Sequence, residues 1–184
     1  NISSFSNVND LNKSVTPELS DSDTTLLHLW AHSDKYRLGG SALYQSFKLY
    51  GGATPDIDDA NQFKVLFEAT QELLDKDFIE ALHDISDGGL ITSLIEMALC
   101  SNQGLDINLD YSDKEQLVPK LFSEEIGLVI EVKNEKLESV RNYLNEKELF
   151  FENIAKKNDK KKININCFKE EVFSEDLITL FNQW

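Results

Sequence analysis

The sequence contains few cysteines and no long apolar segment. Its two cysteines, Cys100 and Cys167, are too few for a disulfide framework, and no cysteine or histidine spacing is typical of a zinc site. Cys100 ends an apolar helical segment and is therefore expected to be a small buried hydrophobic residue. Because no segment is long enough to span a bilayer and no signal peptide is recognisable, we expect a reducing, cytoplasmic setting.

Basic residues are also scarce. The sequence has 18 lysines and arginines against 33 aspartates and glutamates, which gives a formal net charge of −15. Nucleic acids and anionic membranes are bound by clustered basic surfaces, so we predict neither as a partner. The one basic segment, residues 156–162, is predicted to be a solvated turn.

Two histidines, His28 and His32, stand four residues apart, a spacing that places metal ligands together on a helix. The segment from Leu26 to Trp30 has the pattern of a strand, however, and the two side chains would then not share a helix face. A metal role for this pair is not favoured.

The chain begins at Asn1 rather than methionine, and its first residues are polar. We therefore expect a piece of a larger protein, in which residues 1–20 lead into a single domain that extends over residues 1–184. A length of 184 residues, 41% of them hydrophobic, is enough for a sizeable core. No internal repeat or long linker divides the chain.

Short strand-like segments alternate with segments of helical periodicity. The expected strands are residues 2–8, 24–30, 82–85, 105–109, 127–132, 150–155, 163–167 and 171–173. The expected helices are residues 41–50, a segment after residue 59, one from residue 89, a short one before residue 123, residues 137–144 and the last turns from residue 175. This alternation predicts the α/β class, as a layered sandwich around a mixed sheet.

The segment HDISDGGL carries the clearest chemical signal. A short strand ends, two glycines follow, and an amphipathic helix begins at Gly89. The N–H groups and the dipole at a helix start favour anions such as phosphate, yet Asp84 and Asp87 would repel a phosphate. A Mg²⁺ ion between carboxylate and phosphate removes this conflict, since Mg²⁺ is usually held by one or two carboxylates and phosphate oxygens.

Two other interpretations of this segment stay open. Ser86 or Asp87 could simply cap the helix, with Gly88 and Gly89 forming the turn. The neighbouring His83 and Asp84 could belong to a metal-dependent phosphohydrolase, although no further histidine lies at a suitable spacing. Neither a P-loop nor a Rossmann motif is present.

Three other patterns are better explained by local structure than by ligands. Gly39-Gly40-Ser41 is predicted to be a turn that starts a helix, although a ligand-binding loop is the alternative. The acidic group before residue 60 suits a helix start. Glu124 and Glu125 are expected to have packing and capping roles rather than to form an acid/base pair.

The motifs also resemble a known family in their order and spacing. The resemblance rests on HDISDGGL, EMAL and GLDINLD, with SSFSNVNDLNKSVTPELS, LGGSALYQSF and PDIDDANQFKVLFEATQELL upstream and LFSEEIGLVIEV and VFSEDLITLFNQW downstream. In these segments the chain resembles the C-terminal-type domain of the aminoimidazole-ribonucleotide-synthetase-like superfamily. Within that superfamily it is most similar to the second half of the synthetase core in large phosphoribosylformylglycinamidine synthases.

The resemblance implies a role for each residue of the glycine turn. The position of Asp84 is a magnesium ligand in the family, and that of Ser86 contacts the nucleotide. Asp87, Gly88 and Gly89 complete the expected nucleotide-binding loop. The implied cofactors are Mg²⁺ and ATP or ADP, and no residue of this chain is expected to be catalytic.

The resemblance further implies an ATP- and glutamine-dependent ligase that converts formylglycinamide ribonucleotide into its amidine in purine biosynthesis. This chain would supply one wall of a Mg-nucleotide site and be inactive alone. Its partners would be the remaining synthetase domains and the glutaminase domain of the same parent, and its exposed apolar surface would make the isolated chain self-associate. The alternative is a structural module whose nucleotide pocket is degenerate.

Overall fold

The computed structural model describes residues 7, 10–31, 35–109, 114–168 and 170–183. Its strands are β1 (Thr24–Trp30), β2 (Ala81–Asp84), β3 (Gly104–Leu109), β4 (Gly127–Lys133), β5 (Phe150–Asn158), β6 (Lys162–Cys167) and β7 (Glu170–Asp176). Its α-helices are α1 (Ala42–Ser46), α2 (Ala60–Asp75), α3 (Gly89–Ser101), α4 (Leu117–Phe122), α5 (Leu137–Glu146) and α6 (Leu177–Gln183). Short 3₁₀ helices cover Leu11–Lys13 and Lys114–Gln116.

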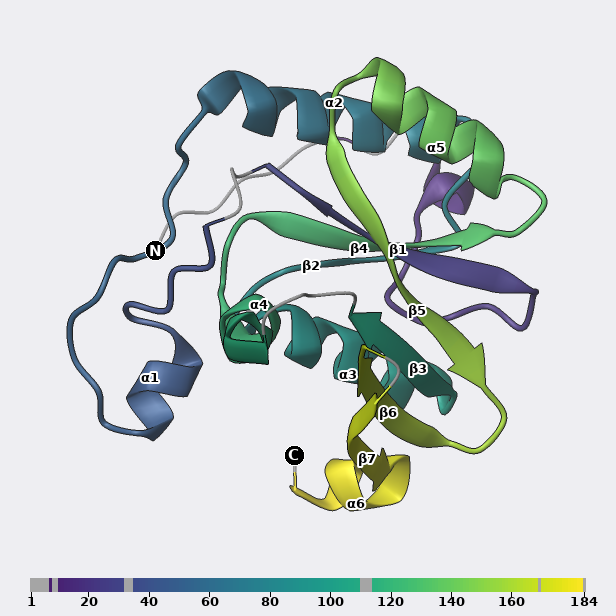
Figure 1. The fold of residues 1–184 in the computed structure, drawn as a ribbon. Coiled ribbons are helices and arrows are strands. Elements are labelled where there is room, and N and C mark those ends of the chain that lie inside the picture. Colours follow the sequence, from purple (N-terminus) through teal and green to yellow (C-terminus); the bar gives the residue numbers. More distant parts are fainter. Residues whose placement is uncertain (1–6, 8–9, 32–34, 110–113, 169, 184) are drawn as a thin grey trace.

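The seven strands form one mixed sheet in the order β2-β4-β1-β5-β3-β6-β7. Within the described residues, β3 and β6 run parallel and the other neighbouring strands run antiparallel. Helices α2 and α5 cover one face of the sheet, and α3 and α4 lie on the other (Figure 1). The predicted α/β sandwich around a mixed sheet is confirmed.

The side chains of the strands β1 and β4 alternate between two hydrophobic cores. In β1, Leu26 packs with the helix α3 side, while Leu27 and Leu29 pack with the α2 and α5 side. All seven residues of β1 are buried, as expected for a central strand with helices on both faces. No helix in the described part of the chain is long and apolar enough to cross a membrane.

The predicted elements are largely present, with one clear difference after the Gly39–Ser41 turn. The helix expected to reach residue 50 ends at Ser46. Lys48 adopts a positive φ of 56°, and the Leu49 N–H donates to the Tyr44 carbonyl over 2.8 Å, which closes the last turn. The strand predicted over residues 2–8 lies, apart from Asn7, outside the described residues.

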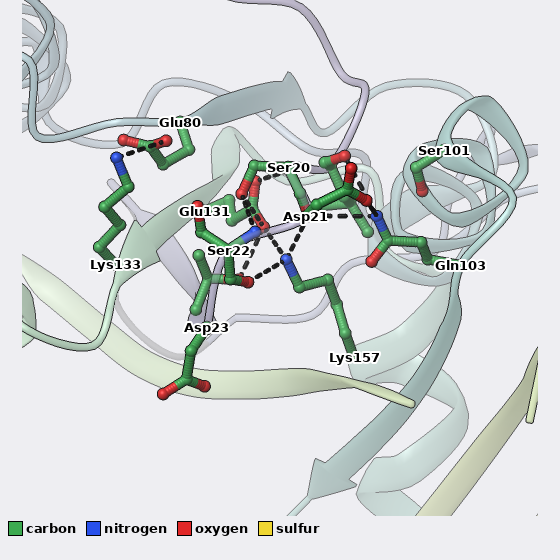
Figure 2. Close-up of polar contacts among 12 residues, drawn as sticks. Ser20, Asp21, Ser22, Asp23, Glu80, Ser101, Gln103, Glu131, Lys133 and Lys157 are labelled. Atoms are coloured by element: carbon green, nitrogen blue, oxygen red, sulfur yellow. Dashed lines mark hydrogen bonds and ion pairs between the residues drawn. The ribbon is translucent and has the colours of Figure 1, made fainter. Parts of the chain in front are cut away.

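The basic segment is not the solvated turn that was predicted. Lys156 and Lys157 belong to β5 and Lys162 to β6, so the connection between the two strands covers only residues 159–161. The Lys157 side chain is 13% exposed, and its Nζ lies 2.8 Å from Oε1 of the fully buried Glu131 on β4 (Figure 2). Charge patterning along the chain does not reveal a partner on a neighbouring strand, so the prediction was wrong for these two lysines.

Cys100 is likewise not the buried residue that was predicted. Burial along α3 extends to Ala98, and Cys100 in the last turn is exposed, whereas Cys167 on β6 is buried. The apolar periodicity identified the buried face of α3 but not how far this face remains covered. His28 lies in β1 with its Nδ1 3.2 Å from Glu152 Oε1, and His32 lies outside the described residues.

Candidate functional site

The HDISDGGL segment forms the connection between β2 and α3, as predicted. Strand β2 ends at Asp84, and Gly88 is the N-cap of α3. The Asp84 side chain is 70% exposed, and Ser86 and Asp87 are also exposed. The structure therefore brings the two carboxylates and the hydroxyl to solvent at one end of the sheet.

Both glycines of this turn are required by the backbone. Gly88 and Gly89 have φ values of +88° and +74°, which side chains rarely adopt. A Cβ atom on Gly89 would lie 2.7 Å from the Ser123 carbonyl oxygen and 2.8 Å from that of Leu121. The start of α3 thus packs directly against the backbone at the end of α4, and Gly89 is needed for this contact whether or not a ligand binds.

The carboxylate of Glu124 accepts hydrogen bonds from the helix starts beside both glycine-rich turns. Its Oε1 accepts from the Gly88 N–H and from the Ala42 N–H, each over 2.8 Å. The Gly89 N–H donates to the Ser86 carbonyl over 3.0 Å. The capping role predicted for Glu124 is confirmed, and the N–H of Gly88 is engaged by an anion of the chain itself.

The Gly39-Gly40-Ser41 segment is a helix-starting turn, as predicted. Gly40 has a φ of +80°, and Ser41 Oγ accepts from the Tyr44 N–H over 3.3 Å at the start of α1. The Gly39 N–H donates to the Ala53 carbonyl over 2.8 Å. These bonds hold the turn against the loop that follows α1.

Glu125 is buried and forms a two-bond ion pair with Arg37. Arg37 Nε and Nη2 donate to Glu125 Oε1 and Oε2, each over 2.7 Å. Arg37 also lies 3.1 Å from Asp58, and the hydrogen bond to Glu125 raises the pKa of the Arg37 guanidinium. Glu125 therefore anchors the chain before β4, which is the packing role predicted for it rather than that of an acid or base.

The end of β2 is held by His83 and Ser93. His83 Nδ1 lies 2.7 Å from the Asp84 carbonyl oxygen, and its Nε2 lies 3.0 Å from Glu96 Oε2. Ser93 Oγ donates to the same Asp84 carbonyl over 2.9 Å. The backbone of Asp84 is therefore fixed, while its carboxylate is largely exposed and has Oδ1 3.5 Å from His83 Nδ1.

A hollow of about 580 Å³ lies beside this turn. Its polar lining comes from the β2–α3 connection and α3, and its apolar lining from α3, α6 and the segment before β1. The lining residues are Pro17, His83, Ser86, Glu96, Leu99, Cys100 and Phe181. Ser86 is an exposed residue of the turn and also lines this hollow.

Within the described residues, no group of three or more histidines, cysteines, aspartates or glutamates is arranged to hold a metal ion. Asp84 can offer one carboxylate, and a Mg²⁺ ion needs six oxygens in an octahedron. Phosphate oxygens, water or groups from other domains would have to complete the shell. Among the described residues, this donor set fits a Mg-nucleotide site that is shared with such groups.

Comparison with known families identifies the fold. Residues 30–167, well over half of the chain, match the family described as AIR synthase related protein, C-terminal domain. The chain belongs to this family. The β2–α3 turn and the Glu124 carboxylate both lie within the matched residues of this AIR synthase related domain.

One curated relative aligns with the whole domain. It is the probable phosphoribosylformylglycinamidine synthase, chloroplastic/mitochondrial, of Arabidopsis thaliana, with 37% identity over 185 residues. The alignment covers 100% of this chain and 13% of the relative. The AIR synthase related domain therefore spans only a small part of that protein's length.

Solved structures share the fold at low identity. T. maritima PurL complexed with FGAR has a TM-score of 0.76 and 18% identity, over 92% of this chain and 30% of that one. The E. coli hydrogenase maturation protein HypE has a TM-score of 0.60 and 19% identity, over 89% and 52% of the two chains. At these identities the likeness concerns the fold of the AIR synthase related domain.

Sequence reasoning missed how the two glycine-rich turns are connected. Glu124 follows Gly88 by 36 residues and Ala42 by 82, so no local pattern indicates that one carboxylate contacts both. The two-bond ion pair of Arg37 with Glu125 is equally non-local, at 88 residues. A paired carboxylate just before a predicted strand was the only sequence signal available.

Proposed function

We propose that this AIR synthase related domain belongs to the second half of the synthetase core of a large phosphoribosylformylglycinamidine synthase. The parent would use ATP and glutamine to convert formylglycinamide ribonucleotide into its amidine in purine biosynthesis. The 37% identity over the whole chain to the Arabidopsis thaliana relative is the main support. Structures of T. maritima PurL with ATP, ADP and FGAR, which share the fold, add further support.

In this proposal residues 1–184 form one C-terminal-type domain, with residues 1–20 as its lead-in. Its partners are the other synthetase domains and the glutaminase domain of the same parent. The domain contributes one wall of a Mg-nucleotide site and has no activity alone. A cytoplasmic setting, as expected from the sequence, is also proposed. The name of the Arabidopsis thaliana relative gives a different setting, chloroplastic/mitochondrial.

The observation that supports the Mg-nucleotide site within this proposal is the exposed Asp84 carboxylate on a fixed backbone. Asp84 would be a ligand of Mg²⁺, and the bound ion would screen the repulsion between this carboxylate and a polyphosphate. Ser86 is exposed two residues further on, and its hydroxyl can donate to a phosphate oxygen. Asp87, Gly88 and Gly89 would shape the loop around the nucleotide.

The direct test is calorimetry on the full-length parent, comparing wild type with Asp84→Asn. Asparagine keeps the size of the side chain but removes the charge that holds the metal, so we expect Mg-nucleotide binding to weaken about tenfold or more. Asp75→Asn is the matched control, because Asp75 ends α2 and its side chain is 79% exposed. Unchanged binding in Asp84→Asn would contradict the proposed role.

A second test uses the isolated chain. With ATP, formylglycinamide ribonucleotide and ammonia it should form no amidine, because the proposal leaves the reacting groups to other domains. With ATP and a divalent metal it should release no phosphate. Turnover in the first assay would contradict the incomplete-enzyme proposal, and turnover in the second would favour a phosphohydrolase.

A structural module with a degenerate pocket is the second candidate. Glu124 favours it, since a carboxylate already accepts the Gly88 N–H that a phosphate would use. This candidate predicts equal nucleotide retention by the wild-type parent and its Asp84→Asn variant. The calorimetric comparison therefore separates the two.

A further inference from the structure

We infer that Glu124 is a positioning residue for the nucleotide site: by linking the Gly39–Ser41 turn to the β2–α3 turn, it holds Ser86 and the turn in place relative to Asp84, whose backbone is fixed by β2 and Ser93. The inference rests on the proposed function, because it assigns Asp84 and Ser86 to a Mg-nucleotide. It adds a residue that touches neither the metal nor the nucleotide and acts through the backbone.

The geometry of the link is specific. A single oxygen, Glu124 Oε1, lies 2.8 Å from the backbone nitrogens of both Ala42 and Gly88. Ala42 is the first residue of α1 and Gly88 is the N-cap of α3. These two helices lie on either side of α4, which ends just before Glu124 (Figure 1). Hydrogen bonds from N–H groups to a carboxylate are stronger than those to a neutral acceptor.

Glu124 is itself held on both sides. The Ser123 N–H donates to the Pro119 carbonyl over 2.9 Å at the end of α4. Glu125 is buried and bound through two hydrogen bonds to Arg37. The backbone of Glu124 therefore has little freedom, and its carboxylate reaches the two turns from a fixed point.

The turns that it joins are equally tight. Gly89 packs against the backbone of residues 121–123 with no space for a Cβ atom. The Gly89 N–H donates to the Ser86 carbonyl over 3.0 Å, so the position of Ser86 depends on the same turn. Without the bond from Gly88 to Glu124, the segment between Asp84 and Gly89 would lose its hydrogen-bonded link to α1 and to the residue that follows α4. A ligand would then have to order this segment on binding, which weakens affinity.

The test compares the wild-type full-length parent with its variants Glu124→Ala, Glu124→Gln and Glu124→Asp. Calorimetry measures Mg-nucleotide affinity, and hydrogen exchange measures protection of the Ala42 and Gly88 amides. We expect Glu124→Ala to bind about tenfold more weakly and to lose protection at both amides. Glutamine keeps an oxygen at the same reach, so Glu124→Gln should rescue binding to within about threefold of wild type.

Glu124→Asp separates the effect of side-chain length from the effect of charge. It also provides the test if Glu124→Ala does not fold. Aspartate is shorter by one methylene and cannot reach both amides, so we expect weakened binding although the charge is kept. Glu138→Ala is the control for the loss of one charge, because Glu138 lies on α5 on the other side of the sheet. It should bind like wild type.

The results distinguish failure of the inference from failure of the proposed function. Wild-type affinity in Glu124→Ala, together with weak binding in Asp84→Asn, would overturn the inference and leave the proposed function standing. Tighter binding in both Glu124→Ala and Glu124→Gln would also overturn it, because Glu124 would then be an anion that competes with phosphate. Wild-type affinity in Asp84→Asn as well would overturn the proposed function and the inference together.

Discussion

Glu131 is a fully buried carboxylate that holds the segment before β1. It accepts hydrogen bonds from the Ser20 N–H over 2.9 Å, the Thr24 hydroxyl over 2.6 Å and Lys157 Nζ over 2.8 Å. Lys157 also donates to the backbone carbonyls of Ser20 and Ser22 (Figure 2). Residues 20–24 are thereby fixed to the sheet, which sets where the chain enters the domain.

Replacing Lys157 with methionine should destabilise the fold strongly. The change leaves Glu131 buried without its counter-charge, for which we expect a loss of about 3–5 kcal/mol in the free energy of unfolding. Lys133→Met is the matched control, because the pair of Lys133 with Glu80 is more exposed and its loss should cost at most about 1 kcal/mol. Urea unfolding of both variants checks this, and similar losses would contradict it.

The buried His28 should make stability depend on pH. Burial lowers the pKa of His28 below its ordinary 6.5, despite the neighbouring Glu152. The unfolded chain therefore binds more protons than the folded chain just below pH 6.5. The free energy of unfolding should decrease as the pH is lowered, by at most about 1.4 kcal/mol per pH unit. Urea unfolding between pH 7.5 and 5 measures this slope.

Glu152 should add a second loss of stability at lower pH. Burial raises the pKa of Glu152, but the His28 hydrogen bond and the charge of Lys120 together lower it below the ordinary 4.5. Stability from this group is present above pH 4.5 and is lost as pH falls through the lowered pKa.

The variant His28→Gln should remove the loss between pH 6.5 and 5. An unchanged slope in this variant would contradict the assignment.

At the scale of single residues, sequence reasoning predicted surface chemistry better than burial. It placed Asp84 at the end of a strand and Ser86 next to the glycine turn that starts a helix, because the strand, glycine and helix signals are all local. It did not predict the ion pair of Lys157 with Glu131, and it wrongly predicted that Cys100 is buried. Both errors concern contacts between segments far apart in the sequence, which composition and periodicity do not report.

At the scale of elements, the start of α3 depends on a close contact with the end of α4. Gly89→Ala places a Cβ atom 2.7 Å from the Ser123 carbonyl oxygen and forces a φ of +74° on a side-chain-bearing residue. We expect a loss of about 3 kcal/mol or more in the free energy of unfolding, measured by urea denaturation.

Gly51→Ala is the control for this variant. Gly51 has a φ of +90°, but no atom lies within 4 Å of a Cβ built there. Its substitution should therefore cost only the conformational penalty of about 1–2 kcal/mol. Equal losses of stability in the two variants would show that the contact between α3 and α4 does not cause the additional loss expected in Gly89→Ala.

Most elements could be predicted because their periodicity is set by burial on defined faces. The strand at residues 24–30 was predicted with its observed bounds, since an apolar segment of this length suits a central strand. The helix α1 was predicted too long, because the left-handed turn at Lys48 depends on no glycine or proline. The connection from α1 to α3 through Glu124 is tertiary and has no periodic signature.

At the scale of the whole molecule, exposed apolar side chains gather beside α1. Phe47, Leu49 and Tyr50 follow this helix, and Tyr50 is 94% exposed. Helix α1 and its loop stand apart from the helices that cover the sheet (Figure 1). An exposed apolar segment of this kind is typical of an interface.

We expect the isolated chain to self-associate through this segment. Sedimentation velocity should show a coefficient that rises with concentration, and the double variant Phe47→Ser/Tyr50→Ser should reduce this rise. Ile178→Ser on α6 is the control, because Ile178 is exposed elsewhere on the molecule. A monomer at all concentrations would contradict the prediction, and a larger effect of the control would place the association at α6.

The central claim is that a Mg²⁺ ion joins Asp84 to the phosphates of a nucleotide. The most direct measurement is the affinity of the full-length parent for ADP with and without Mg²⁺, in wild type and Asp84→Asn. We predict that Mg²⁺ strengthens wild-type binding by about tenfold or more and has little effect on the variant. An equal response of both proteins to Mg²⁺ would contradict the claim.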